Sequence, residues 1–270
     1  METKKLNTII SFLLVSGLFV FLIFLSGCTD IFTGKGTESV ISGSNAVVLN
    51  KVYYDKDVKA NTNIEIKVEL ENRGEEARNI KVQLIGLSNK WNPYPVPPQT
   101  LPSLQNKEKK NVTFTLITPL VDANTTYSFG VYVEYDYSSS YSAMLKLEKD
   151  KQTNTVKATV TNEKMVYEAP LTIKSSNIQV DENNRKIIAS FIIRNSGNGE
   201  VKNNGKVVIT SSGISCETQT TLEEAEKEIK CETNIPNFEN IYNLEFSIKL
   251  SYTYSYKTSE DAYKIEVYKV

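Results

Sequence analysis

Two stretches of alternating apolar and polar residues, similar in order and spacing, constrain this chain most. In the first, Ile64, Ile66, Val68 and Leu70 alternate with mostly charged residues and lead into Asn72-Arg73-Gly74. The second has the same alternation and the same kind of turn: Ile187, Ala189, Phe191, Ile193 and Asn195-Ser196-Gly197. Apolar residues at every second position indicate a half-buried β-strand, and Asn-x-Gly indicates a turn. The sequence therefore predicts one strand–turn unit twice.

Each copy also contains a later strand in which aliphatic residues give way to tyrosine. In the first copy the residues on one face are Phe129, Val131, Val133, Tyr135 and Tyr137. Their counterparts lie 117 positions later: Phe246, Ile248, Leu250, Tyr252 and Tyr254. The Asn-x-Gly turns are 123 positions apart, and we attribute the difference between the two offsets to a small deletion in a loop. We expect the tyrosines to continue the inward face of each strand.

The segment Thr221–Lys230 is ambiguous when it is considered alone. Thr221 and Glu224 have the spacing of a helix capping box. Its counterpart in the first copy, Leu104–Thr113, has the pattern of a turn that enters a strand. The comparison favours a turn and a strand in both copies, with a single helical turn at 222–226 as the alternative.

Many short strands separated by turns predict an all-β chain with two tandem immunoglobulin-like β-sandwiches. We assign residues 46–163 to the first and 164–270 to the second. The alternating piece Val156–Val160 either closes the first sandwich or opens the second.

A family resemblance is based on the same strand and turn residues. In each copy an alternating strand, Asn-x-Gly and a second alternating strand are followed by Ser-Leu or Thr-Leu and a strand that closes on Pro. This order resembles CARDB, the cell-adhesion-related domain found in bacteria, and immunoglobulin-like domains of archaeal surface-layer-like proteins. The resemblance implies the fold and says almost nothing about ligands. The second copy departs from it by lacking a loop like Pro93–Pro102 and by carrying two cysteines.

The N-terminal 28 residues have the pattern of an export signal. Lys4 and Lys5 precede an apolar run from Ile9 to Leu25. That run is longer than most cleaved signal cores and slightly shorter than most spanning helices. It ends in Leu25-Ser26-Gly27-Cys28, which resembles the lipobox of secretory lipoproteins and implies lipid attachment at Cys28. The alternative is an uncleaved signal-anchor helix. Both place the rest of the chain outside the cytoplasm.

Residues 29–45 are rich in Gly, Ser and Thr and show no sustained period. We interpret them as a flexible tether between the anchor and the folded part.

Cysteine and histidine content limits the possible chemistry. The 270-residue chain has no histidine, which excludes imidazole bases and histidine metal ligands. Apart from Cys28, only Cys216 and Cys231 remain. In an exported protein we expect these two to form a disulfide.

Nothing in the sequence indicates catalysis, a cofactor or a metal site. Three carboxylate clusters lie at turns or outward positions: Glu75-Glu76, Asp55/Asp57 and Glu223-Glu224. Water solvates both carboxylates of each pair there, so neither is set up as the acid or the base of a catalytic pair. Asn195–Gly199 lies between two strands, so we interpret it as a hairpin turn and not as a phosphate loop. The net charge of −1 gives no general attraction for nucleic acid.

Four aromatic residues are candidates for a contact surface. Trp91 and Tyr94 lie in a proline-rich loop, and Tyr141 and Tyr256 lie near the ends of the tyrosine rows. The alternative is that Trp91 and the tyrosines pack at the rim of the core. Asn111 and Asn124 begin glycosylation sequons.

Together these features predict a membrane-anchored, non-catalytic structural or adhesive module of the cell envelope. Its expected partners are the membrane, through the N-terminus, and an envelope protein or polysaccharide, with no small-molecule substrate. The alternative function is an accessory subunit of a surface filament or of an envelope or transport complex.

Overall fold

The computed structural model describes residues 35–39, 45–165 and 168–270, which belong to one compact unit. Strands make up 67% of the described residues and helix 2%, so this part of the chain is all-β, as predicted. The predicted signal segment, residues 1–28, lies outside the described residues.

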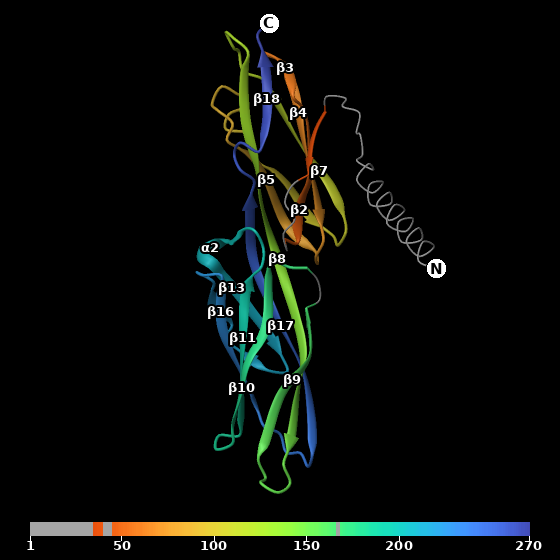
Figure 1. Ribbon diagram of the computed structural model, residues 1–270, viewed down its shortest axis with the longest axis vertical. Helices are drawn as coiled ribbons and strands as arrows, with labels where there is room; N and C mark the ends of the chain where they lie inside the picture. Colours follow the sequence, from red (N-terminus) through yellow and green to blue (C-terminus); the bar gives the residue numbers. More distant parts are fainter. Residues whose placement is uncertain (1–34, 40–44, 166–167) are drawn as a thin grey trace, which may run out of the picture. The chain divides into compact units, whose positions relative to one another are not determined.

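Two four-stranded antiparallel sheets are built from the equivalent parts of the two sequence copies (Figure 1). The first contains, in spatial order, β1 (Lys35–Ser39), β2 (Val47–Asp55), β4 (Asn63–Asn72) and β7 (Lys109–Ile117). The second contains, in spatial order, β10 (Leu171–Asp181), β11 (Lys186–Asn195), β16 (Glu226–Asn234) and β14 (Ser215–Cys216).

A ten-stranded sheet extends through both halves of this unit. Its main path runs through β15 (Gln219–Thr221), β13 (Lys206–Ser212), β17 (Ile241–Lys257), β8 (Thr125–Lys149), β18 (Tyr263–Tyr268) and β3 (Asp57–Lys59). Four further strands pair alongside this path: β5 (Ala77–Ile85), β6 (Gln99–Leu104), β9 (Val156–Met165) and β12 (Glu200–Val201). The four-residue α2 (Lys202–Gly205) links β12 to β13.

The longest strands, β8 and β17, pair with each other and join the two halves. All 17 residues of β17 lie opposite β8, from Ile241 opposite Glu148 to Lys257 opposite Tyr132. In Figure 1 they are the long green and blue strands that run through the middle of the fold. β18 then pairs with the first residues of β8 and, in parallel, with β3. The last strand of the chain therefore belongs to the first half, and strand pairing crosses the boundary that we predict near residue 164.

The ladder between β8 and β17 has an internal symmetry that follows from the repeat. Tyr135 lies opposite Tyr254, and Tyr137 lies opposite Tyr252. The repeat offset of 117 positions relates Tyr135 to Tyr252 and Tyr137 to Tyr254, so it converts the first pair into the second. The centre of this exchange is the pair Asp136 and Thr253, whose side chains share a hydrogen bond of 2.6 Å. The two copies are thus related by a local two-fold arrangement about that pair.

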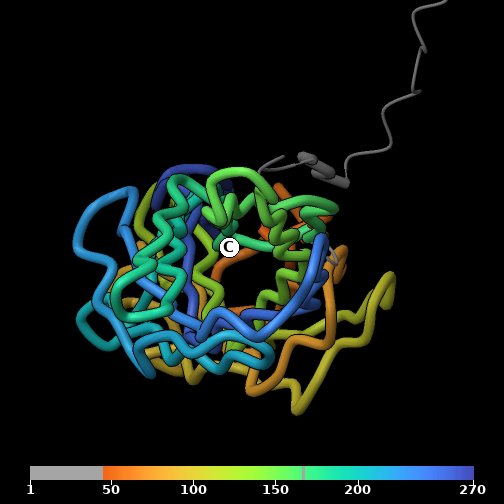
Figure 2. Tube along the Cα trace, turned by 90° about the horizontal axis from the view of Figure 1, so that it is seen from below, coloured from red at the N-terminus to blue at the C-terminus, as the bar shows by residue number. Residues whose placement is uncertain are grey.

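The core lies between each four-stranded sheet and the ten-stranded sheet. In the first half, Tyr54 of β2 meets Phe129 of β8 edge-on, with ring centroids 5.3 Å apart. In the second half, Phe191 of β11 contacts Tyr141 of β8 and Phe246 of β17. Figure 2 shows the trace of these strands from below. The alternating faces predicted from sequence are confirmed, since the apolar positions of both copies are buried.

The local predictions have mixed outcomes. Residues 221–230 form the end of β15, a turn and the start of β16, so the turn-and-strand interpretation is confirmed. Val156–Val160 lies in β9, which pairs with the C-terminal part of β8 in the second half. Asn195–Gly199 is a turn, but the hairpin prediction is wrong, because β11 and β12 belong to different sheets.

Part of the predicted tether is a strand. Lys35–Ser39 forms β1 and pairs with β2 from Lys35 opposite Asp55 to Ser39 opposite Lys51. The outer edge of β2 would otherwise expose unpaired backbone groups, and β1 satisfies them.

Candidate functional site

Four tyrosines gather at the centre of the β8–β17 ladder, and we call them the tyrosine cluster: Tyr135, Tyr137, Tyr252 and Tyr254. All four are buried, and neighbouring ring centroids lie 6.0 to 6.4 Å apart. Burial raises the pKa of Tyr254 to about 12, so its hydroxyl keeps its proton at neutral pH. The Tyr254 hydroxyl is therefore available both to donate and to accept a hydrogen bond.

Tyr137 holds the first Asn-x-Gly turn. Its hydroxyl accepts a hydrogen bond from the amide of Glu75 (2.6 Å) and donates one to the carbonyl of Glu168 (3.1 Å). Within the turn, the amide of Gly74 donates to Asn72 Oδ1 (3.0 Å). Asn72 Nδ2 donates to the carbonyl of Leu104 (2.7 Å). A Cβ at Gly74 would overlap the Tyr137 hydroxyl, so glycine is required there for space.

Tyr254 holds the second turn in an equivalent way. Its hydroxyl accepts from the amide of Gly199 (2.7 Å) and donates to Asn195 Oδ1 (3.1 Å). The amide of Gly197 also donates to Asn195 Oδ1 (3.1 Å). A Cβ at Gly197 would overlap the Tyr254 hydroxyl. The copies therefore share a unit, an Asn-x-Gly turn held by a strand tyrosine, and we call each one a tyrosine clasp.

The clasps connect the two halves reciprocally. Glu168, which precedes β10 of the second half, accepts from Tyr137 at the first turn. Asn45, which precedes β2 of the first half, accepts from the amide of Asn198 at the second turn (3.1 Å). Asn45 and Glu168 are 123 positions apart, as the two turns are. The segment that leads into each half is thus hydrogen-bonded at the Asn-x-Gly turn of the other half.

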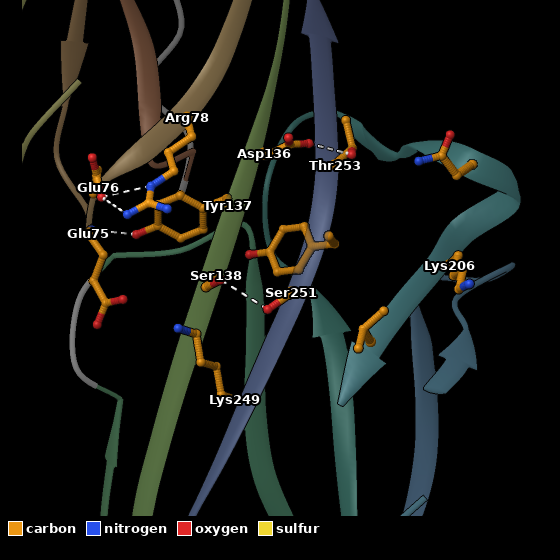
Figure 3. Close-up of a pocket in the computed structure, with 13 residues that line it drawn as sticks. Glu75, Glu76, Arg78, Asp136, Tyr137, Ser138, Lys206, Lys249, Ser251 and Thr253 are labelled. Carbon is orange, nitrogen blue, oxygen red and sulfur yellow. Dashed lines mark hydrogen bonds and ion pairs between the residues drawn. The ribbon is translucent and has the colours of Figure 1, made fainter. Parts of the chain in front are cut away.

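A groove of about 580 Å³ lies over this junction on the outer face of the ten-stranded sheet (Figure 3). Glu76 and Arg78 form an ion pair in it (2.6 Å), and Asp136 is held by Thr253. Lys249 projects into the same space. The Arg78 hydrogen bond, followed by one from Gln105, lowers the pKa of Glu76. The groove therefore presents a polar hydrogen-bonding surface in which both Glu76 and Asp136 already have partners.

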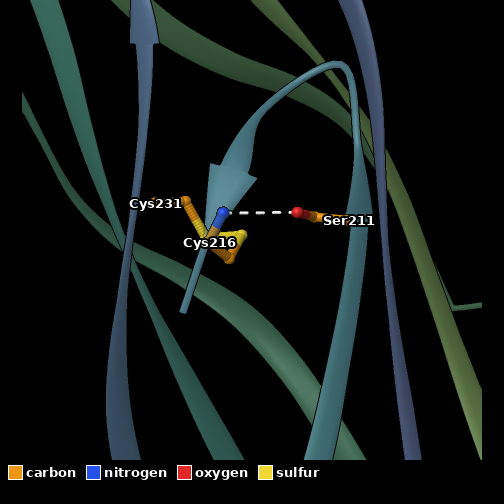
Figure 4. Close-up of a disulfide and its surroundings, with 3 residues drawn as sticks. All are labelled: Ser211, Cys216 and Cys231. Carbon is orange, nitrogen blue, oxygen red and sulfur yellow. Dashed lines mark hydrogen bonds between the residues drawn. A yellow bond between two sulfur atoms is a disulfide. The ribbon is translucent and has the colours of Figure 1, made fainter. Parts of the chain in front are cut away.

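The predicted disulfide is present. Cys216 in β14 and Cys231 in β16 lie directly opposite each other, with Cα atoms 4.0 Å apart, and their sulfurs are bonded (Figure 4). The amide of Cys216 donates to Ser211 Oγ (3.2 Å). Closing a loop of this size is worth about 3 kcal/mol in the chain-entropy model. The bond fastens the short edge strand β14 to the second four-stranded sheet.

The aromatic contact surface predicted from sequence is corrected by burial. Trp91, Tyr141 and Tyr256 are 2%, 1% and 3% exposed, so they do not offer a surface to a partner. Trp91 meets Tyr127 edge-on, with centroids 5.6 Å apart. Tyr94 is the exception at 54% exposed. The alternative interpretation, that these rings pack against the core, holds for the other three.

The remaining candidate residues are described only in part. Asn111 on β7 and Asn124 before β8 are both exposed, and their glycosylation stays a prediction. The predicted lipid attachment site, Cys28, lies outside the described residues. In the part of the chain that the structure describes, no group of three or more Cys, Asp or Glu side chains is arranged to hold a metal ion. The same residues include no helix long and apolar enough to cross a membrane.

The clasps were missed by sequence reasoning, although their signal was present. Both Asn-x-Gly turns and both tyrosine rows are visible in the repeat, but nothing in a period-two pattern says that a tyrosine hydroxyl reaches a turn about 60 residues away.

No family model and no curated protein matches the chain. One of the solved structures found by similarity is the envelope protein VP37 of White Spot Syndrome Virus. It is 7% identical, covers 44% of this chain and 98% of its own length, and has a TM-score of 0.25. A similarity that weak supports no statement about function.

Proposed function

We propose that this chain is a non-catalytic structural spacer of the cell envelope, made of two tandem immunoglobulin-like β-sandwiches and anchored in the membrane by its N-terminus. The β8–β17 ladder is the observation that carries the proposal. Tandem domains are usually joined by an exposed linker that few contacts cross. Here 17 consecutive residues of β17 lie opposite β8, and the reciprocal clasps add bonds on both sides.

This construction suits a module that holds its ends apart. A strand rises about 3.3 Å per residue, so the 25 residues of β8 extend for about 80 Å. Bending between the halves would require breaking backbone hydrogen bonds of a continuous sheet. The groove over the junction is the surface that such a spacer offers to an envelope protein or polysaccharide.

The absence of a hinge is tested by measuring a distance across the junction. Spin labels on Thr115→Cys in β7 and Glu228→Cys in β16, both exposed, report on the two small sheets. The full chain with Cys28→Ser in detergent keeps the introduced thiols the only reactive ones. Pulsed dipolar spectroscopy should give one narrow distance distribution. The control pair Thr115→Cys with Lys264→Cys lies within the first half, and a much broader distribution for the first pair than for this control would refute the spacer.

Anchoring is tested at Cys28. If Cys28 carries the lipid, Cys28→Ser should stop incorporation of labelled fatty acid and leave a heavier, unprocessed chain in the mass spectrum. Ser16→Ala, within the apolar run, should be labelled and processed normally. Unchanged labelling of Cys28→Ser would exclude the lipoprotein, and a heavier mature chain without lipid in both variants would favour an uncleaved signal anchor.

A further inference from the structure

The end of the fold at which the described chain begins can be located from strand pairings. Lys35 lies opposite Asp55 at the end of β2. Asp57, two residues later, begins β3 and lies beside Glu266 of β18. After β18, the amide of Lys269 donates to Asn124 Oδ1 (3.2 Å), in the connection from β7 to β8. These contacts place Lys35 at the same end of the first half as the loop 118–124, which is the end where β3 and β18 lie in Figure 1. We call this end the tether end.

Three large apolar side chains are exposed at the tether end; one is Val270, 85% exposed and next to Lys269, and the other two lie in loops. Leu120 is 77% exposed in the loop after β7, and Tyr94 is 54% exposed in the proline-rich loop. The two loops are joined at their bases, where Asn92 and Ile117 exchange backbone hydrogen bonds of 3.3 and 2.7 Å. The buried Trp91 packs nearby against Tyr127. Tyr94 and Leu120 therefore project from loops that are fastened to the core.

The sequence places this end close to the anchor. Only seven positions separate Cys28 from Lys35. Seven residues span at most about 25 Å when fully extended. Most of the predicted tether, residues 29–45, is thus unavailable for lifting the fold, because β1 already pairs with β2 from Lys35 onward. The same limit holds for a lipid on Cys28 and for a membrane helix that ends there.

We propose that the tether end rests on the surface of the membrane that holds the anchor, with Tyr94 and Leu120 inserted at the level of the lipid headgroups. Tyrosine suits this boundary because its ring is apolar and its hydroxyl is polar. The exposed lysines Lys90 and Lys269 lie in the same region, where they meet lipid phosphates. Asp55 and Asp57 are at this end too, so apolar contact and the short tether, and not net charge, carry the docking.

This inference rests on the proposed membrane anchor and adds an orientation to it. The β8–β9 turn, at the other end of the 25-residue β8, then points away from the membrane. Ile241, opposite Glu148 near that turn and 57% exposed, is a matched apolar position that should stay in water.

The test compares two added tryptophans in the full chain reconstituted in phosphatidylcholine–phosphatidylglycerol vesicles. Leu120→Trp reports on the tether end, and Ile241→Trp reports on the opposite end. Trp91 stays in place, and the signal of the unsubstituted chain is subtracted. Lipids brominated near the headgroup should quench the added fluorescence of Leu120→Trp strongly and that of Ile241→Trp not at all. Tyr94→Trp, a second substitution at the tether end, should behave like Leu120→Trp.

Flotation of the vesicles separates the two proposals. If the chain floats and neither Leu120→Trp nor Tyr94→Trp is quenched, docking is wrong and the anchor stands. If it floats and Ile241→Trp alone is quenched, the fold lies the other way round and docking is again wrong. A chain that does not float with the vesicles refutes the anchor, and docking with it.

Discussion

Tyr256→Ala should lower the free energy of unfolding by about 3–5 kcal/mol, the usual cost of removing a large aromatic ring from a core. Tyr256 is 3% exposed and lies opposite Val133 where β17 meets the first half. Burial raises the pKa of its hydroxyl. The truncation leaves a cavity at the point where β17 crosses from one half to the other.

Denaturant unfolding followed by circular dichroism measures this loss. Tyr94→Ala is the matched control, because the ring that it removes is 54% exposed. Its effect should stay within about 0.5 kcal/mol, as for most surface substitutions. A Tyr256→Ala protein as stable as Tyr94→Ala would mean that Tyr256 is not part of the core.

The tyrosine rows show both what the sequence reveals and what it leaves out. Period two correctly placed Tyr135 and Tyr137 on the inward face of a strand, because alternation is a local property of the backbone. Their description as the rim of a sandwich assumed that the strand ended there. In the structure β8 continues from Thr125 to Lys149, so the supposed rim is the middle of a longer sheet.

Strand partners are the part that alternation does not specify. An alternating strand presents the same two faces whichever strand lies beside it, so nothing local showed that β18 returns to the first half. The repeat held one usable clue. When two copies of a repeated strand pair antiparallel, the repeat offset relates the residues of one pair to those of another. Tyr135–Tyr254 and Tyr137–Tyr252 are related in this way.

The candidate surfaces were harder to predict, for a different physical reason. Burial of Trp91 depends on how a loop folds over the end of a sheet, and loops have no periodicity to interpret. The disulfide was predictable, because the predicted export favours oxidised cysteines and the two that remain leave one pairing.

Gly74→Ala should cost about 2–4 kcal/mol, because the new methyl group overlaps the Tyr137 hydroxyl and crowds the Glu168 carbonyl. The overlap must displace the hydroxyl, and the Glu75 amide and the Glu168 carbonyl then lose their shared partner. Tyr137→Phe alone should cost about 1 kcal/mol, since it removes the hydroxyl without adding bulk. Equilibrium unfolding in denaturant gives each value.

The two substitutions should not add. Once the hydroxyl is absent, the methyl group at position 74 has less to displace, so the double variant should be more stable than the sum by at least about 0.5 kcal/mol. Gly197→Ala with Tyr254→Phe should show the same coupling, because a Cβ at Gly197 likewise overlaps the Tyr254 hydroxyl. The crossed pair, Gly74→Ala with Tyr254→Phe, shares no steric contact and should be additive. Equal coupling in matched and crossed pairs would mean that the substitutions loosen the junction as a whole, and that the clasps are not separate units.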